Sequence, residues 1–420
     1  METKTVRMPY GRGFIDLEIP TKNLREISIP KEPLGLADEE KEIEVALRKP
    51  IKKQPLSAMI DPQDRVAIII DDVTRPTPSY KIIPTVLNEL EIPNENIIII
   101  VATGLHRGNT EDELKTMLGR DVLKKVKVVN HDAFFGKGLA YVGETSRGTK
   151  LEINKLARDA DITITTGHIE PHLIAGFTGG RKSILPGVAG ANSINHNHGV
   201  ENLDHPKAKI GILEGNPIHE DMVEAAKMVG VDFMVNVVLN SRKEIIKAVA
   251  GDFIEAHFEG VEFYRKYYRV EIGEPADIVI TSSGYPVDIN FYQSIKSIIA
   301  AEPFVKAGGL IVSLAECEGG FGTRLFYEWM TSFSSRVDII DRIKREGYRA
   351  DIDHCHLIGR ILEKSDIIVV SPQISVHEMK RSFIKTFTSP EKAINSALNK
   401  KGKDATILTL PYAQRLVPKY

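Results

Sequence analysis

The sequence predicts an α/β protein with two α/β domains, mainly parallel sheets and an active site in the cleft between the domains. Short runs of β-branched residues alternate with helical stretches, which is typical of parallel sheets covered by helices. This rhythm stops near residues 269–275 and then starts again. Polar residues follow directly after the apolar runs of the first half. The predicted domains are therefore residues 1–270 and 271–420, and it stays open whether the last helix packs back on the N-terminal domain.

Composition narrows the class of protein before any motif is considered. The chain has 420 residues, of which 42 % are hydrophobic and 27 % charged, enough for two domains with real cores. The net charge of −2 gives no basic footprint for nucleic acid or for an anionic membrane surface. The longest apolar runs have strand length, well below the ~20 residues of a membrane span. No signal-peptide pattern opens the chain, and its two cysteines, Cys317 and Cys355, exclude a disulfide framework. These features predict a cytoplasmic protein.

The elements of the first domain can be placed in order. Residues 11–19 alternate and predict a β-rich entry, and residues 39–49 predict an acidic helix. Thr110 and Glu113 form a capping box that opens a helix over 110–118. An amphipathic helix is expected over 216–229, followed by a hairpin of 232–240 and 244–252. The remaining expected elements are strands at 65–70, 96–102, 125–129 and 161–166 and a helix at 82–90.

The second domain repeats the pattern of strand and helix. Its expected strands are 277–283, 309–316, 366–372 and 405–411, and a helix begins at Tyr292. Ser389 followed by Pro390 is a good N-cap and first-turn pair for the last helix. Both halves therefore predict the same layered architecture.

Polar residues with chemical potential follow the strands of the first domain. In open α/β sheets, ligands bind outside the carboxyl ends of the strands. These residues should therefore gather at one edge of the sheet. They are Asp71, Asp72, Arg75, His106, His168 and His172.

The stretch from His168 to His198 has an unusual composition for a packed core. It holds four of the chain's 12 histidines and five glycines, together with Arg181 and Lys182. Glycine lets the backbone approach a ligand closely, histidine binds metals and moves protons near pH 7, and lysine can form a covalent bond. This mixture predicts a loop wrapped around a cofactor.

Two familiar interpretations of this stretch fail on spacing. A phosphate-binding P-loop needs glycine directly before its lysine, where this chain has Arg181. The amides of Gly179 and Gly180, with Arg181 and Lys182, could still hold one phosphate. The two histidines of His168–His172 also do not match a zinc-hydrolase helix, because the glutamate is misplaced and Pro171 disfavours a regular helix. Other histidines are read as structural: His131, His205, His219, His257 and His377.

The second domain has its own candidate site at the start of the helix near Tyr292. Gln293 and Lys296 are three residues apart and share a face of its first turn. A helix N-terminus beside a lysine and an amide suits a carboxylate. The neighbours Phe291 and Tyr292 favour a cleft-facing site over an ordinary surface turn with a solvated lysine.

Four segments together resemble the lactate racemase family, the nickel-pincer enzymes that interconvert stereoisomers of 2-hydroxy acids. The segments are DDVTRPTP (71–78), ATGLHRG (102–108), 168–190 with His198 downstream, and YPVDINFYQSIK (285–296), and the resemblance covers nearly the whole chain. It implies a nickel pincer nucleotide, a pyridinium-3-thioamide-5-thiocarboxylic acid mononucleotide that holds nickel through sulfur and carbon. It also implies lactate or another small 2-hydroxy acid as substrate, and cofactor-biosynthesis proteins as partners, and it leaves the oligomeric state open.

The resemblance also implies a role for individual residues. Lys182 matches the lysine joined to the cofactor, and His198, rather than His196, matches the nickel-binding histidine. His106 and His172 match the two acid/base histidines. The remaining matches are Asp72 and Arg75 near cofactor and substrate, Gly179, Gly180 and Arg181 in the cofactor loop, and Tyr292, Gln293 and Lys296 at the substrate.

The chemistry explains why two histidines are needed. The α-hydrogen of a 2-hydroxy acid is not acidic, but removal of a hydride is easier when a base takes the hydroxyl proton at the same time. Hydride can then return to the other face of the keto acid, and each face needs its own base. Lys296 and Arg75 would hold the carboxylate during this exchange.

Two departures from the family pattern bear on the substrate. The only tryptophan is Trp329, whereas family members carry one near His354–His356 of this chain. Leu173 and Ile174 stand where aromatic residues are expected. A racemase or epimerase of a longer hydroxy acid, or of a sugar acid at C2, is therefore an alternative. A non-catalytic phosphate- or nucleotide-binding protein is the alternative of another class, and a zinc hydrolase is a further one.

Overall fold

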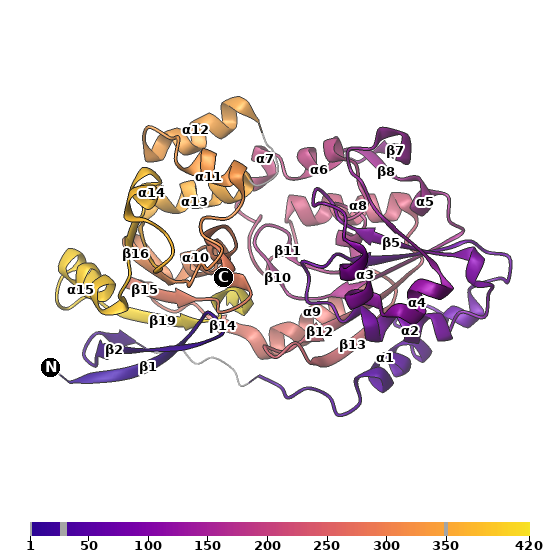
Figure 1. Ribbon diagram of the computed structural model, residues 1–420, viewed down its shortest axis with the longest axis horizontal. Helices are drawn as coiled ribbons and strands as arrows, with labels where there is room; N and C mark the ends of the chain where they lie inside the picture. Colours follow the sequence, from indigo (N-terminus) through magenta and orange to yellow (C-terminus); the bar gives the residue numbers. More distant parts are fainter. Residues whose placement is uncertain (1, 26–31, 348–351) are drawn as a thin grey trace. The chain divides into compact units, whose positions relative to one another are not determined.

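The computed structural model describes residues 2–25, 32–347 and 352–420. The chain divides into two compact units (Figure 1). The central unit is Lys31–Tyr267, and the terminal unit combines Met1–Pro30 with Tyr268–Tyr420. Each unit is built on a six-stranded sheet, so the predicted α/β class with two mainly parallel sheets is confirmed.

The sheet of the central unit has the strand order β13-β12-β9-β4-β5-β6. All its neighbours are parallel except the antiparallel pair β12–β13, which is the predicted hairpin. The strands β4, β9 and β12 are almost entirely buried, which explains their continuous β-branched runs. The strands are β4 (Val66–Asp71), β5 (Ile97–Ala102), β6 (Lys127–Asn130), β9 (Ile162–His168), β12 (Phe233–Leu239) and β13 (Ile245–Gly251).

Helices follow the strands of the central unit as the sequence predicts. The capping box of Thr110 and Glu113 opens α3, and Asn216 caps α8 through its side chain. A buried core joins α1 and α2 to the sheet through residues such as Ile43, Leu47 and Ile82. The helices are α1 (Glu39–Arg48), α2 (Ser79–Asn88), α3 (Glu111–Leu118), α4 (Arg120–Lys125), α5 (Lys155–Arg158), α6 (Ala191–Asn197), α7 (Val200–Leu203), α8 (Pro217–Val229) and α9 (Glu255–Tyr268).

Two small antiparallel pairs complete the central unit. The hairpin of β7 (Leu139–Glu144) and β8 (Lys150–Asn154) precedes α5. The two-residue strands β10 (Pro171–His172) and β11 (Gly176–Phe177) pair within the histidine- and glycine-rich stretch, and the short helix η4 (Gly180–Ser183) follows them. The stretch is therefore a folded loop up to Gly190, and α6 forms its end.

The sheet of the terminal unit is parallel throughout, with the order β18-β17-β16-β15-β19-β3. Its strands are β15 (Ala276–Ser282), β16 (Val305–Leu314), β17 (Asp366–Val370), β18 (Lys385–Phe387), β19 (Ile407–Pro411) and β3 (Leu24–Arg25). Its helices are α10 (Phe291–Ala301), α11 (Arg324–Met330), α12 (Arg336–Glu346), α13 (Ile352–Lys364), α14 (Val376–Arg381) and α15 (Pro390–Lys401). A further parallel pair joins β14 (Arg269–Glu271) to β20 (Val417–Lys419). In the described part of the chain, no helix combines the length and the apolar character that crossing a membrane requires.

The first residues of the chain belong to the terminal unit and not, as expected, to the N-terminal domain of residues 1–270. The hairpin of β1 (Thr3–Tyr10) and β2 (Gly13–Pro20) buries Met8, Leu17 and Ile19 in the same core as β15 and β16. The strand β3 then pairs with β19. The hairpin joins the terminal unit because its apolar side chains are buried against residues that are distant in sequence. Local sequence patterns do not reveal such contacts.

The last helix packs within its own unit. Ala393, Ile394 and Ala397 of α15 lie in the core of the terminal unit's sheet. Ser389 caps this helix through its side chain and Pro390 occupies its first turn, as expected from the sequence.

Candidate active site

The carboxyl ends of three parallel strands bring the predicted polar residues to one edge of the central sheet. Asp71 ends β4 and pairs with Ala102 at the end of β5. His168 ends β9, which is the other neighbour of β4. The segments that carry Asp72, His106 and His172 start from these strand ends. The register of these parallel strands therefore brings the residues that follow them to the same edge of the sheet.

Asp72 and His106 form a hydrogen-bonded pair at this edge. Nδ1 of His106 lies 2.7 Å from Oδ2 of Asp72, whose other oxygen accepts the amide and hydroxyl hydrogens of Thr74. Burial alone would raise the pKa of Asp72, but His106, Arg75 and Thr74 together lower it. The carboxylate is therefore ionised and accepts the Nδ1 hydrogen of His106. Nε2 of this half-exposed ring is left for proton exchange, as in other carboxylate–histidine pairs.

His168 is a buried cation between two carboxylates. Its Nδ1 lies 2.7 Å from Oγ1 of Thr77 and 3.3 Å from Oδ2 of Asp71. Its Nε2 lies 3.2 Å from Oε1 of Glu170. Burial opposes protonation, yet Glu170 and Asp71 raise the pKa of His168 to about 9. Through this imidazolium, the loop after β9 is held to Asp71 and Thr77 of the segment that carries Asp72 and Arg75.

His172 and Lys182 are in direct contact. Nζ of Lys182 lies 3.0 Å from Nε2 of His172, and both residues are partly buried. The backbone amides of Ile174 and Ala175 face Nδ1 of the same ring at 3.4 and 3.2 Å. Nδ1 is therefore the acceptor nitrogen, and Nε2 is turned toward the amine. The β10–β11 turn, which starts at His172, fixes this orientation.

Arg181 has a different environment from the phosphate contact expected for it. It is 1 % exposed, and its two terminal nitrogens donate to backbone carbonyl oxygens of the loop. Burial lowers the pKa of Arg181 to about 9. Nη1 also lies 2.9 Å from Nε2 of His257, whose pKa burial lowers to about 3, so this ring is neutral. The carbonyls belong to Ala175, Phe177, Thr178 and Gly179.

The glycines of this loop also contact the protein interior. The amide of Gly180 donates to Oδ1 of Asn236 on β12 at 2.8 Å, so it is not directed at a ligand. Gly179 has a φ of 81°, and a Cβ there would lie 2.6 Å from the same Asn236 oxygen. The close approach of Asn236 requires glycine at 179. Arg181 and Asn236 thus hold the loop in a fixed conformation. The Gly180 amide and the Arg181 guanidinium were expected to contact a phosphate of the cofactor, and both instead form hydrogen bonds within the protein.

His198 and His196 differ in position although they are two residues apart. His198 is the C-cap of α6 and is 7 % exposed. His196 is exposed, and its Nδ1 lies 2.9 Å from Oγ1 of Thr149 in the β7–β8 turn. Across the residues that the structure describes, no group of three or more His, Cys, Asp or Glu side chains could hold a metal ion.

The substrate-binding candidates of the terminal unit lie in the first two turns of α10. The Asn290 side chain caps this helix by accepting the amide hydrogen of Gln293 at 2.9 Å. Phe291 was expected to favour a cleft-facing site, and it is fully buried against Phe321. The ring of Tyr292 packs on His354, with centroids 4.3 Å apart.

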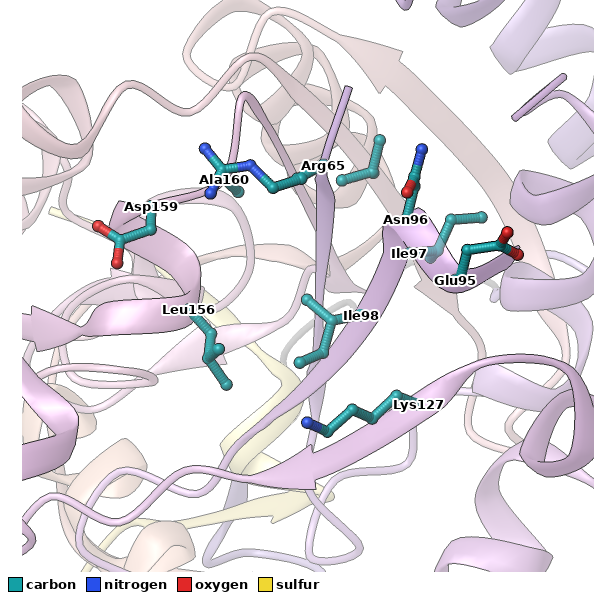
Figure 2. A pocket seen from close by; sticks show the side chains of 10 residues that line it. Arg65, Glu95, Asn96, Ile97, Ile98, Lys127, Leu156, Asp159 and Ala160 are labelled. Carbon is teal, nitrogen blue, oxygen red and sulfur yellow. The ribbon is translucent and has the colours of Figure 1, made fainter. Parts of the chain in front are cut away.

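A pocket of about 240 Å³ lies at the opposite edge of the central sheet (Figure 2). It is lined by residues at the amino ends of β4, β5 and β6, among them Arg65 and Lys127. Arg65 is tied to Asp161 by an exposed ion pair. None of the predicted site residues lines this pocket.

Sequence reasoning missed several residues that build the site. Thr77 binds His168, Asn236 holds the loop at Gly180, and His257 contacts Arg181. Asn236 is the only one with a recognisable signal, because an amide inside an apolar strand run needs a hydrogen-bond partner. The others become visible only when the chain is folded.

Comparison with known proteins places the chain in a family. Residues 10–211 match the family model of the lactate racemase N-terminal domain, and residues 272–415 match that of the C-terminal domain. The chain is 36 % identical to the lactate racemase of Thermoanaerobacterium thermosaccharolyticum over 414 residues, and 32 % identical to that of Lactiplantibacillus plantarum over 413 residues. Each alignment covers 97 % of both proteins.

Solved structures agree with this assignment. The lactate racemase apoprotein of T. thermosaccharolyticum matches with a TM-score of 0.94 at 35 % identity, covering 99 % of this chain and all of that one. A protein of Thermotoga maritima matches with a TM-score of 0.69 at 18 % identity, covering 93 % of this chain and all of that one, which shows the shared fold alone. A racemase is an isomerase, and the chain belongs to the lactate racemase family.

Proposed function

We propose that the protein is a lactate racemase that interconverts D- and L-lactate with a nickel pincer nucleotide and two histidine acid/bases. The contact of Lys182 with His172 carries this proposal, because it puts a potential covalent anchor beside a proton-transfer group. His106, held by Asp72, lies at the same sheet edge. Two imidazoles and one lysine at one edge match the needs of a racemase with a tethered cofactor.

The residues present fit the proposed cofactor. The donor set is an amine at Lys182 and an imidazole at the buried His198, and imidazole suits nickel. Lys182 would form the thioamide and His198 would bind the metal, with Asp72, Arg75 and Gly179 beside the nucleotide. When bound, the group would accept a hydride from the substrate and return it.

The chain's own contribution is proton transfer at two nitrogens. His106 keeps a hydrogen on Nδ1 for Asp72, so Nε2 accepts the substrate hydroxyl proton. His172 accepts backbone amides at Nδ1, so its neutral ring carries its hydrogen at Nε2, and we assign proton donation on the other face of the substrate to this nitrogen. The buried carboxylate of Asp72 stabilises the imidazolium that forms on His106. We assign binding of the substrate carboxylate to Arg75 and Lys296, and orientation of the substrate to Tyr292 and Gln293.

The test uses protein co-expressed with the cofactor-making enzymes, which we propose as its partners. Chiral chromatography should show D-lactate forming from L-lactate and the reverse, and mass spectrometry should show added mass on Lys182. Lys182→Ala protein should lack both the added mass and the activity. An unmodified protein that is fully active would contradict the proposal.

A second candidate is the same chemistry on another 2-hydroxy acid. The contact of Tyr292 with His354 favours it. The polar ring of His354 packs on Tyr292, a substrate-binding candidate, in the region where family members carry a tryptophan. A panel of single-enantiomer acids followed by polarimetry decides between lactate, longer hydroxy acids and sugar acids. A non-catalytic phosphate-binding protein is disfavoured, because Arg181 and the Gly180 amide are bound within the loop. It would require that His106→Ala and His172→Ala leave ligand binding unchanged.

A further inference from the structure

The helix α6 is too short to hold its own orientation. It has seven residues, and its N-cap Gly190 provides no side-chain hydrogen bond. Helices shorter than about 12 residues are marginal by themselves in water. His198 is the C-cap of α6, so the position of its ring depends on what holds this helix.

Asp221 of α8 holds the last residue of α6. The carboxylate is fully buried and accepts hydrogens from Asn197 Nδ2 at 2.7 Å, Thr149 Oγ1 at 2.7 Å and Thr145 Oγ1 at 2.6 Å. Asn197 is itself fully buried and directly precedes His198. Hydrogen bonds to a buried carboxylate are about twice as strong as neutral ones. Asp221 therefore anchors the backbone one residue from the proposed metal ligand.

A second chain of hydrogen bonds leads from Asp221 to His196. Thr149 gives its single hydroxyl hydrogen to Asp221, so the same oxygen must accept the Nδ1 hydrogen of His196 at 2.9 Å. The amide of Thr149 donates to Oγ1 of Thr145 at 3.1 Å, which fixes the β7–β8 turn. Both residues before His198 are thus tied to one carboxylate.

We propose that Asp221 is a positioning residue for His198, and this rests on the proposed role of His198 as nickel ligand. A metal–imidazole bond would tolerate errors of only about 0.2 Å in the position of the ring. A small shift of α6 would therefore weaken the metal bond. The bond of the cofactor to Lys182 is covalent and does not depend on α6. Loss of the anchor should release nickel and leave the adduct on Lys182 in place.

The first test compares two alanine substitutions in the same helix. Asn197→Ala removes the link between α6 and Asp221, whereas Asn195→Ala removes an amide whose Oδ1 accepts no hydrogen bond within the described chain. Co-expressed proteins are dialysed against a chelator, nickel is measured by mass spectrometry of the metal, and the Lys182 adduct by mass spectrometry of the peptide. We expect nickel loss about 10- to 100-fold faster in Asn197→Ala, with unchanged adduct. Asn195→Ala should match the unsubstituted protein.

The second test uses matched isosteric changes in two carboxylates. Asp221→Asn removes the charge and replaces one accepting oxygen with an amide donor that faces at least one of the three donors, whereas Asp232→Asn makes the same change where the side chain accepts the Thr163 amide hydrogen at the amino ends of β9 and β12. Faster nickel loss in Asp221→Asn alone supports the proposal. Nickel retention in both Asp221→Asn and Asn197→Ala, or equal loss in the controls, overturns it.

A third measurement separates this proposal from the proposed function. If the unsubstituted protein carries neither nickel nor adduct, the proposed function fails. Hydrogen–deuterium exchange of the apoproteins then still tests the anchor, because it needs no cofactor. Faster exchange of the α6 amides in Asn197→Ala than in Asn195→Ala supports the tie to Asp221, and equal exchange overturns it.

Discussion

The two sheets end in very different surroundings at their carboxyl edges. The edge of the central unit concentrates charge: His168 lies between two carboxylates, Asp72 holds His106, and Arg181 is buried among carbonyls. The edge of the terminal unit near α10 is aromatic, with Phe291 packed on Phe321 and Tyr292 on Phe326, and α10 also carries the partly buried Lys296. At the first edge, ionised groups are fixed by hydrogen bonds, which fits the proton transfer that we propose there. We propose substrate recognition, and no proton transfer, for the second edge.

The largest effects should come from the histidines of the charged edge. His106→Ala and His172→Ala should each lower kcat by about 10²- to 10⁴-fold, because each removes one proton-transfer group. Chiral assays in both directions measure this in loaded protein. The matched control is His131→Ala, since His131 donates to the carbonyl of Ala189 and serves structure. If His131→Ala lowered kcat as much as His106→Ala and His172→Ala do, at an equal fraction of cofactor-modified Lys182, the proposed proton-transfer role of the two histidines would be contradicted.

Arg181→Ala tests whether buried charge at this edge serves the fold. We expect a loss of unfolding free energy on the order of 3–5 kcal/mol, because a guanidinium is removed and four loop carbonyls lose its hydrogen bonds. Urea unfolding measures it. Arg107→Ala removes an exposed ion pair with Glu113 and should leave the unfolding free energy nearly unchanged, because water screens exposed charges. A phosphate-binding role would instead show as weaker ligand binding at unchanged stability.

The pH dependence of stability tests the cationic state of His168. Its pKa in the folded protein is raised to about 9, above the ordinary value of 6.5. Its contribution is therefore fully present below pH 6.5 and is lost as pH rises through 9. The unfolding free energy that His168 contributes at low pH and loses at high pH is on the order of 3 kcal/mol. Urea unfolding between pH 6 and pH 10 should show this slope, and His168→Gln should flatten it. If His168→Gln showed the same slope, the pH dependence of stability would come from another titratable side chain.

The smallest effect is expected at the aromatic edge. Lys296→Ala should raise KM for the hydroxy acid about tenfold, with a smaller change in kcat, because it removes a charge partner of the substrate and no proton-transfer group. Lys306→Ala, which removes a partner of Asp277, is the matched control. Loss of kcat without a change in KM would show that this edge also takes part in the chemical step.

Much of this architecture follows from local sequence patterns. The β-branched runs of β4, β5 and β9 and the capping box at Thr110 act over a few residues, and the structure contains them as expected. The order of strands and polar segments also placed Asp72 and His106 at one edge, since parallel strands point the same way. The residue types of the candidate site are thus evident from sequence, although their bonds are not.

By itself, the sequence determined the fold class, the strand ends that carry polar residues and the stretch around Lys182, because hydrophobic periodicity and turn chemistry are local. Only the tertiary structure decided that the first hairpin joins the terminal unit, that Arg181 faces inward, and that His168 is a cation. These outcomes depend on burial and on hydrogen-bond partners that are distant in sequence, as Thr77 is from His168. A glycine or an arginine in a loop looks the same in sequence whether it faces a ligand or its own backbone.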